Sequence, residues 1–395
     1  MSKKQTYAGA FMGAAFLMAT SAIGPGFITQ TTIFTSALLA SFGFVIFISL
    51  LLDIGVQLNI WRIIGVSKLY APALANKVFP GAGILLTILI VLGSLAFNIA
   101  NVAGTGLGLN VLTGCSTETG AVISSMIAII IFLMKQAGKA LDWFTKVLGF
   151  IMIGLTLYVA IQSQPPLVEV IHKTFIPDKI DETIILTIVG GTVGGYISFA
   201  GIHRLLDAGI SGTAALPEIS RSSVTGIIIT SVMRTVLFLA VLGVVAKKII
   251  LDTQNPAAAV FETVAGQIGY RLFGLILWSA AITSVVGSAF TAVSFLKASL
   301  PTAQKNHRFY IIGFILLSTI IFLWVGKPVQ LLVFGGAING LILPVALAII
   351  LTAAFKKSIV GDYKHPLWMS IAGWVVVAVM SWMSVKAIMD FINQV

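Results

Sequence analysis

Two glycine-rich stretches interrupt long apolar runs and place unpaired backbone groups inside them. Gly24-Pro25-Gly26 breaks the first run, and Gly190-Gly191 with Gly194-Gly195 breaks the sixth. Proline removes a helix hydrogen bond and glycine loosens the backbone around it, so each break exposes amide and carbonyl groups. Such groups are tolerated inside a bilayer only where protein or a water-filled cavity receives them. The two breaks therefore predict a substrate site near the membrane midplane.

The side chains around the two breaks carry no charge. A half-helix that starts after the first break presents unpaired amides and the positive end of its dipole, and both favour an anion. Small, hydroxyl, amide and aromatic side chains flank the two breaks and can hold a small organic acid. We expect the substrate site to consist of Gly24, Gly26, Phe27, Thr29, Gln30, Thr192, Gly194, Gly195, Tyr196 and Phe199.

Four further polar residues lie within apolar runs. Asp53 and Arg234 fall near the middle of the second and seventh runs, where an ionised group needs a partner, a cavity or substrate. We expect them to pair or to alternate as partners in a proton-coupled cycle; the alternatives are a static ion pair or an Arg234 side chain that reaches a vestibule. Asn98 and Asn101 are predicted to act in coupling or gating, with helix association as the alternative.

The elements that position these residues are membrane spans. The 395 residues are 58% hydrophobic and 9% charged, with a mean hydropathy of +1.05, which indicates an all-α integral membrane protein. We predict a single transmembrane domain, residues 1–395, with eleven spans and the bilayer as a partner. The apolar runs cover about residues 8–38, 42–64, 82–112, 119–136, 142–162, 183–209, 223–246, 270–297, 309–326, 328–355 and 367–391.

The net charge is +11, and the basic residues lie singly or in adjacent pairs, most of them between these runs. Scattered charges do not form the basic patch that nucleic-acid binding requires, so no nucleic-acid partner is expected. With the N-terminus in the cytoplasm, sixteen basic residues face inward and seven outward. The positive-inside rule then predicts a multi-pass plasma-membrane protein with a cytoplasmic N-terminus and an outside C-terminus.

The two breaks also suggest an internal repeat. If spans one to five (about residues 8–162) form one unit and spans six to ten (about 183–355) form another, the odd number of spans inverts the second unit. The broken helices then become the first member of each unit, and the helix at about 367–391 is an extra element. The alternative is an unrelated arrangement that contains two kinked helices.

Several motifs carry a resemblance to a known family. Ala22-Ile23-Gly24-Pro25-Gly26-Phe27, Asn101-Val102-Ala103-Gly104 and Gly191-Thr192-Val193 resemble segments of the natural resistance-associated macrophage protein (NRAMP) family of divalent-metal transporters. The resemblance covers essentially the whole chain in order. It implies the leucine-transporter-type fold, with eleven spans in a 5+5 inverted repeat whose helices one and six are broken.

The departures from this family concern its metal site. The family has Asp-Pro-Gly-Asn in the first span and Met-Pro-His in the sixth; here those ligand positions hold Gly24, Phe27, Gly194 and Tyr196. A transition-metal ion needs charged oxygen, nitrogen or sulfur ligands, and these four side chains supply no charge. The family's acidic pair in the third span is replaced by Asn98 and Asn101. The resemblance thus implies a divergent member without the metal-binding motif.

These observations favour a proton- or sodium-coupled importer of a small carboxylate-bearing solute. Relatives without the metal motif are associated with 5-oxoproline metabolism, which makes this acid a candidate by resemblance. The alternatives are a carrier of a divalent cation such as Mg²⁺ or Mn²⁺ and a non-transporting sensor or scaffold. The chain has no nucleophile motif and no phosphate-binding glycine loop, so neither an enzyme, a bound cofactor nor an ATP-driven pump is expected.

Overall fold

A computed structural model describes residues 3–297 and 300–393; side chains are described except at 3–8, 135–146, 301 and 391. Every regular element in these ranges is helical, as the composition predicted. The long helices are α1 (Lys3–Ala22), α2 (Pro25–Leu38), α3 (Phe42–Ser67), α5 (Ala82–Thr113), α6 (Thr117–Leu133), α7 (Lys135–Gln162), α9 (Glu182–Val193), α10 (Ile197–Asp207), α11 (Leu216–Val245), α12 (Pro256–Lys297), α14 (His307–Val325), α15 (Pro328–Ala353) and α17 (Leu367–Ile392).

Each of the eleven apolar runs corresponds to one of these helices or, for the first and sixth runs, to a broken pair. Eight helices of the described ranges are long and apolar enough to cross a membrane, or nine if a pair bent by 103° after α7 is one span. This number is below eleven for two reasons. α2 and α3 are continuous enough to count as one span, and α6, with 17 residues, is too short to count. The two-unit division of the chain stays a prediction.

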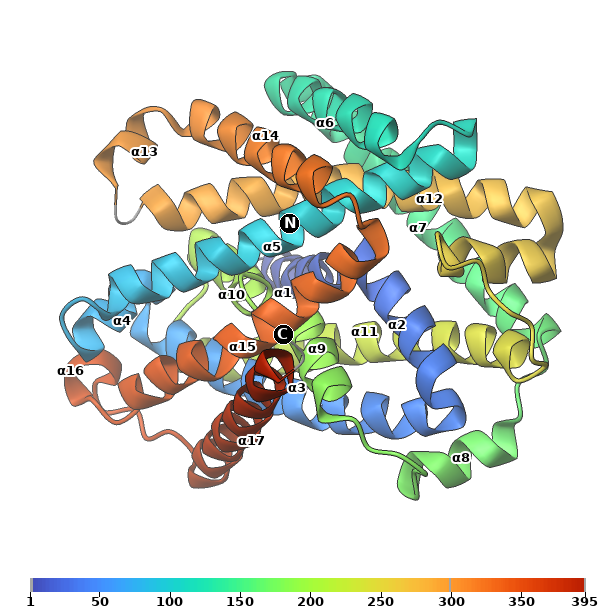
Figure 1. Ribbon diagram of the computed structural model, residues 1–395. Helices are drawn as coiled ribbons and strands as arrows, with labels where there is room; N and C mark the ends of the chain where they lie inside the picture. The colour runs from blue at the N-terminus through green and yellow to red at the C-terminus, as the bar shows by residue number, and fades with distance from the viewer. Residues whose placement is uncertain (1–2, 298–299, 394–395) are drawn as a thin grey trace.

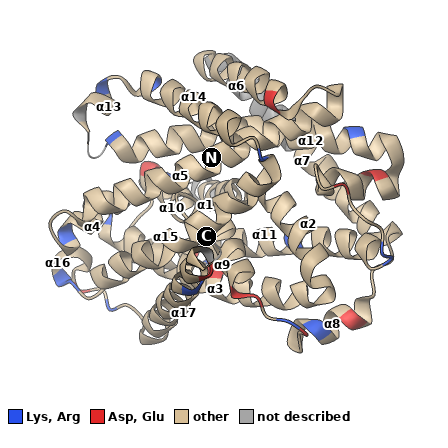
Figure 2. Ribbon diagram, in the orientation of Figure 1, with Lys and Arg blue, Asp and Glu red and all other residues tan. Residues whose placement is uncertain are grey.

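Four short helices connect the spans: α4 (Ala71–Val78), α8 (Leu167–Phe175), α13 (Pro301–Lys305) and α16 (Lys357–Val360). In Figure 1, α4, α13 and α16 gather at the left end of the bundle and α8 lies at the opposite end. Figure 2 shows Lys and Arg at the end that carries α4, α13 and α16, and a largely uncharged middle. This separation of charged ends from an apolar centre is what a protein embedded in a bilayer requires.

The interior consists of two apolar clusters. The first joins α1, α3, α9, α10 and part of α15, and Trp61 is among its fully buried side chains. The second joins α5, α6, α7, α12 and α14 around residues such as Phe261 and Phe273, whose rings stack at 4.5 Å. Phe27 of α2 belongs to the second cluster and Tyr196 to the first. The residues that follow the two helix breaks therefore belong to different clusters.

Candidate functional site

The first break lies between α1 and α2. Gly24 has an extended backbone (φ −120°, ψ −171°) and precedes Pro25, which is the first residue of α2. Proline suits this position because its missing N–H would have no helix partner there. The amide of Ile28 donates to the Gly24 carbonyl at 3.3 Å, so the amides of Gly26 and Phe27 precede the first full turn. The predicted break in the first span is confirmed.

Three other helices surround this break. A side chain at Gly24 would approach Asn101 Oδ1 on α5 at 3.7 Å and Ser284 Oγ on α12 at 3.8 Å. A side chain at Gly26 would approach the Leu332 carbonyl of α15 at 3.2 Å. The glycines thus let the polar backbone of the break lie directly beside polar groups of α5, α12 and α15.

The second break separates α9 from α10 at Gly194, Gly195 and Tyr196. Gly195 has a φ of +55°, in the left-handed region that favours glycine. The expectation that Gly190 and Gly191 belong to this break is wrong, because both residues are helical within α9. Their role is close packing: a Cβ at Gly190 would overlap the backbone of α15, and one at Gly191 would lie 2.7 Å from Gln30 Oε1.

Asn339 of α15 is a site residue that the sequence analysis missed. It is fully buried, and its amide nitrogen donates to the carbonyls of Gly93 (3.0 Å) and Gly335 (2.8 Å). Its Oδ1 has no hydrogen-bond partner and occupies the space where a Cβ of Gly195 would lie. Asn339 therefore fills the second break. In the sequence, Asn339 could have been singled out as a polar residue that stands among the glycines of an apolar run.

The predicted aromatic residues take different places. Phe27 is buried on α2, and the Tyr196 ring meets Phe97 of α5 edge to face at 6.0 Å. Phe199 packs instead against His203 and Phe295, at 5.9 Å from each ring centre. The structure thus brings Tyr196 to α5, whereas Phe199 joins an aromatic cluster toward the far end of α10.

The hydroxyl and amide side chains near the breaks are mostly engaged by the backbone. Thr192 donates to the Ile188 carbonyl of its own helix at 2.8 Å, and Gln30 donates to the Leu332 carbonyl of α15 at 2.9 Å. Thr29 is buried on the same helix as Gln30. Gln30 Oε1 has no hydrogen-bond partner, so it is free to accept one.

Asn98 and Asn101 lie one turn apart on the buried face of α5. Asn98 Oδ1 accepts a hydrogen bond from Ser288 of α12 at 3.0 Å, while its Nδ2 has no partner. Asn101 is the residue that lies beside Gly24. The polar contact between α5 and α12 therefore continues to the first break.

Asp53 of α3 and Arg234 of α11 line one small cavity, together with Ser49 and Thr192. Both charged side chains are buried, at 2% and 3% exposure. The Arg234 guanidinium lies over the Phe27 ring, 4.4 Å from its centre. The structure thus places the two predicted coupling residues together, although no ion pair within 4.0 Å joins them.

A hydrogen-bonded cluster lies at the end of α10. His203, with its ring 5.0 Å from that of Tyr70, accepts a hydrogen bond from the amide of Ala71, the first residue of α4, at 3.2 Å. Tyr70 donates to Asp207, and this bond with burial raises the pKa of Tyr70 to about 12. His203 packs among aromatic rings and ties α10 to α4.

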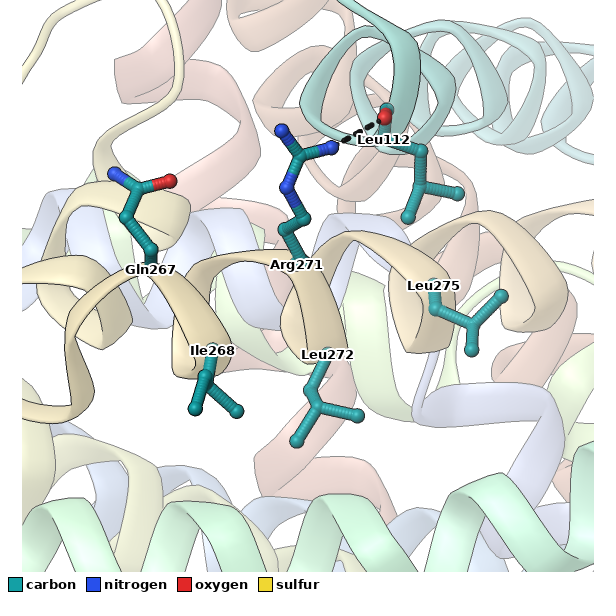
Figure 3. Close-up of a pocket in the computed structure, with 6 residues that line it drawn as sticks. All are labelled: Leu112, Gln267, Ile268, Arg271, Leu272 and Leu275. Carbon is teal, nitrogen blue, oxygen red and sulfur yellow. Dashed lines mark hydrogen bonds between the residues drawn. The ribbon is translucent and has the colours of Figure 1, made fainter.

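A cavity of about 480 Å³ lies along α12, with Leu112 of α5 also in its lining. Figure 3 shows Ile268, Leu272 and Leu275 along one helix, with Arg271 donating to the Leu112 carbonyl at 2.8 Å. Its lining is almost wholly apolar, and it contains neither break. We therefore do not assign it to substrate.

Within the described ranges, no group of three or more His, Cys, Asp or Glu side chains is arranged to hold a metal ion. Residues 15–390 match the family described as natural resistance-associated macrophage protein-like (Nramp). The chain belongs to this family. The membership predicted from the motifs around Gly24 and Gly191 is therefore confirmed, and with it a multi-pass membrane protein from a family of transporters.

Among curated relatives, the uncharacterized membrane protein YcsG of Bacillus subtilis is 59% identical over 374 residues, covering 95% of this chain and 93% of YcsG. The divalent metal cation transporter MntH of Xylella fastidiosa is 22% identical over 323 residues, covering 76% of this chain and 68% of MntH. The similarity to YcsG thus extends over nearly the full length of both proteins.

Two solved structures share the fold. The Eremococcus coleocola manganese transporter, solved with an aromatic bis-isothiourea compound, has a TM-score of 0.74 at 16% identity and covers 98% of this chain and 88% of its own. A nucleobase-cation-symport-1 family transporter with bound bromovinylhydantoin has a TM-score of 0.60 at 15% identity, covering 95% and 93%. The predicted leucine-transporter-type fold, with broken first and sixth spans, is confirmed.

Proposed function

We propose that this Nramp-family protein is a secondary transporter that takes up a small carboxylate-bearing solute, such as 5-oxoproline, with a coupling proton or sodium ion. One observation carries the proposal: the positions beside the two breaks hold Gly24, Phe27, Gly194 and Tyr196, none of which is anionic. The amides that open α2 favour a carboxylate at the same place. Aromatic rings on both sides suit a small apolar ring or chain.

A divalent cation such as Mg²⁺ or Mn²⁺ is the second candidate. The names of MntH and of the manganese transporter favour it, as do the oxygens of Asn101 and Ser284 near Gly24. Hard cations accept neutral oxygen ligands but usually also need carboxylates. The first break lies beside amide and hydroxyl groups, which leaves the charge of such an ion uncompensated.

The direction of transport and the orientation of the chain in the membrane belong to the same proposal. The concentration of Lys and Arg at the end that carries α4, α13 and α16 (Figure 2) supports a cytoplasmic position for that end in the plasma membrane. The N-terminus is then cytoplasmic and the C-terminus outside. Asn98 and Asn101, between the first break and α12, are proposed to transmit the state of the site to α12.

Transport by purified protein in proteoliposomes tests the proposal. We expect labelled 5-oxoproline to enter faster than into empty vesicles and to respond to a proton or sodium gradient, while labelled Mn²⁺ stays at the background level. A matched pair of variants locates the site: Gly26→Val places a side chain beside the Leu332 carbonyl, whereas Gly313→Val on α14 enters open space. Mn²⁺ uptake without acid uptake would favour the second candidate, and transport of neither would favour a sensor.

A further inference from the structure

The cavity between α3, α9 and α11 combines two opposite charges with very little space. It is lined by Ser49, Asp53, Thr192 and Arg234 and measures about 10 Å³, roughly the room for one water molecule. The Oγ of Ser49 has no hydrogen-bond partner. The cavity thus combines buried, incompletely hydrogen-bonded polar groups with the apolar side chains of Ile46, Leu50 and Ile188.

The Arg234 side chain is held in place, but its terminal hydrogen-bond donors have no partner. Its Nη1 and Nη2 are buried and have no hydrogen-bond partner, while the Phe27 ring lies 4.4 Å beneath the guanidinium. The ring positions the charge through a cation–π contact and leaves the planar edge of the guanidinium free. That edge matches the two oxygens of a carboxylate, which it binds in bidentate fashion.

Asp53 supplies the complementary group. Its Oδ1 is buried without a hydrogen-bond partner, and no ion pair within 4.0 Å joins the carboxylate to Arg234. Two buried charges that are not in contact are costly, and a ligand that bonds to both removes that cost. An ionised carboxylate accepts hydrogen bonds only, so the matching ligand group is an N–H donor.

The helices that enclose the cavity are the ones able to open it. α2 begins at the first break and α9 ends at the second, and α9 contributes Thr192 to the lining while α2 contributes the ring under Arg234. In transporters with broken helices, one repeat or bundle rocks or gates against the other around the substrate site. Movement of α9 away from α3 and α11 would enlarge the cavity that Asp53 and Arg234 line.

We propose that Arg234 and Asp53 form a two-point recognition site for the substrate. Arg234 binds its carboxylate through Nη1 and Nη2, and Asp53 accepts a hydrogen bond from an adjacent N–H. The substrate class is thus a small acid that carries an N–H donor next to its carboxylate. This assignment rests on the proposed function, and within it Arg234 takes the place of the α2 amides as the partner of the substrate carboxylate.

Binding to purified variants tests the assignment, with three probes. 5-Oxoproline has both groups, 5-oxotetrahydrofuran-2-carboxylate replaces the N–H by a ring oxygen, and 2-pyrrolidinone lacks the carboxylate. We expect the wild type to bind the lactone at least about 10-fold more weakly than 5-oxoproline and 2-pyrrolidinone more weakly still. In Asp53→Ala, the difference between 5-oxoproline and the lactone disappears.

Removing one buried charge can unfold the protein, so a double variant is needed. Asp53→Asn/Arg234→Met removes both charges together and leaves neither uncompensated. We expect it to fold, as judged by a single gel-filtration peak, and to bind 5-oxoproline about 10- to 100-fold more weakly than the wild type. A merely structural role of the two charges predicts unchanged binding in this variant.

The outcomes separate the two proposals. Wild-type transport of 5-oxoproline together with wild-type affinity in the double variant overturns the assignment of Arg234 and Asp53, while the proposed function stands. A wild type that binds none of the three probes overturns the proposed function and this assignment with it. Equal binding of the lactone and 5-oxoproline by the wild type removes Asp53 from the site.

Discussion

Gly195 allows a stringent test of the second break. It adopts a φ of +55°, and a Cβ there would overlap Asn339 Oδ1. In Gly195→Ala, the left-handed backbone costs about 1–2 kcal/mol for a residue with a Cβ. Displacement of Asn339 from a fully packed position adds about 1–3 kcal/mol. The expected loss of stability is therefore about 2–5 kcal/mol.

The assay is the midpoint of thermal unfolding in detergent, followed by tryptophan fluorescence. We expect Gly195→Ala to lower this midpoint by several degrees. Asn339→Ala loses two hydrogen bonds of about 1 kcal/mol each but opens the space that the new methyl group needs. The double variant should therefore be less destabilised than the sum of the single variants by about 1–3 kcal/mol.

A matched control is available on α12. Gly287 is helical, and a Cβ there would meet nothing within 4 Å, so Gly287→Ala should leave the midpoint unchanged or raise it slightly. A wild-type midpoint in Gly195→Ala would refute the left-handed break. Strict additivity with Asn339→Ala would show that Asn339 does not occupy it.

Three further predictions concern packing and protonation. Gly190→Ala forces a Cβ into the backbone of α15 and should lower the unfolding midpoint far more than Gly313→Ala, which enters open space. Trp61→Phe loses the hydrogen bond to the Ser198 carbonyl (3.0 Å) and should destabilise the fold by about 1 kcal/mol. An unchanged unfolding midpoint would show that this bond does not stabilise the fold. Burial, with Arg62 nearby, lowers the pKa of His365 from 6.5 to about 4. The unfolded chain then binds the proton more readily, so stability falls as pH drops from about 6.5 toward 4. For a fully buried ring, the loss of folding stability at pH 5 would be about 2 kcal/mol. Because the His365 ring is partly exposed, we expect about half of this, about 1 kcal/mol. His365→Gln should flatten this part of the midpoint–pH curve, and parallel curves would contradict it.

The spans could be predicted because their signal is local. Apolar runs bounded by turn residues gave most helix ends within a few residues, as for the run at 42–64, which corresponds to α3 at Phe42–Ser67, whereas α7 and α11 begin seven residues before their runs at 142–162 and 223–246. Short connecting helices such as α4 and α8 lack a spanning apolar run and were missed. The first break was also local, since Pro25 both starts α2 and prevents α1 from continuing.

The details of the site depend on contacts between distant segments. Gly190 reads as a helix breaker in sequence, but its neighbour α15 makes it a packing residue within α9. Asn339 could not be assigned because its partner Gly195 lies in another span. Phe199 was placed near the substrate from its proximity to Tyr196, yet the rotation of α10 directs it to Phe295. Asp53 and Arg234, expected as partners from the cost of burying charge, line one cavity, but no ion pair within 4.0 Å joins them.

The central claim is that a site whose two breaks carry no anionic side chain selects a carboxylate over a metal ion. Isothermal titration calorimetry of the purified wild-type protein measures this choice directly. We expect a saturable heat with 5-oxoproline and, after correction for dilution, none with Mn²⁺ at the same concentrations. Saturable Mn²⁺ binding with no heat from the acid would contradict the account.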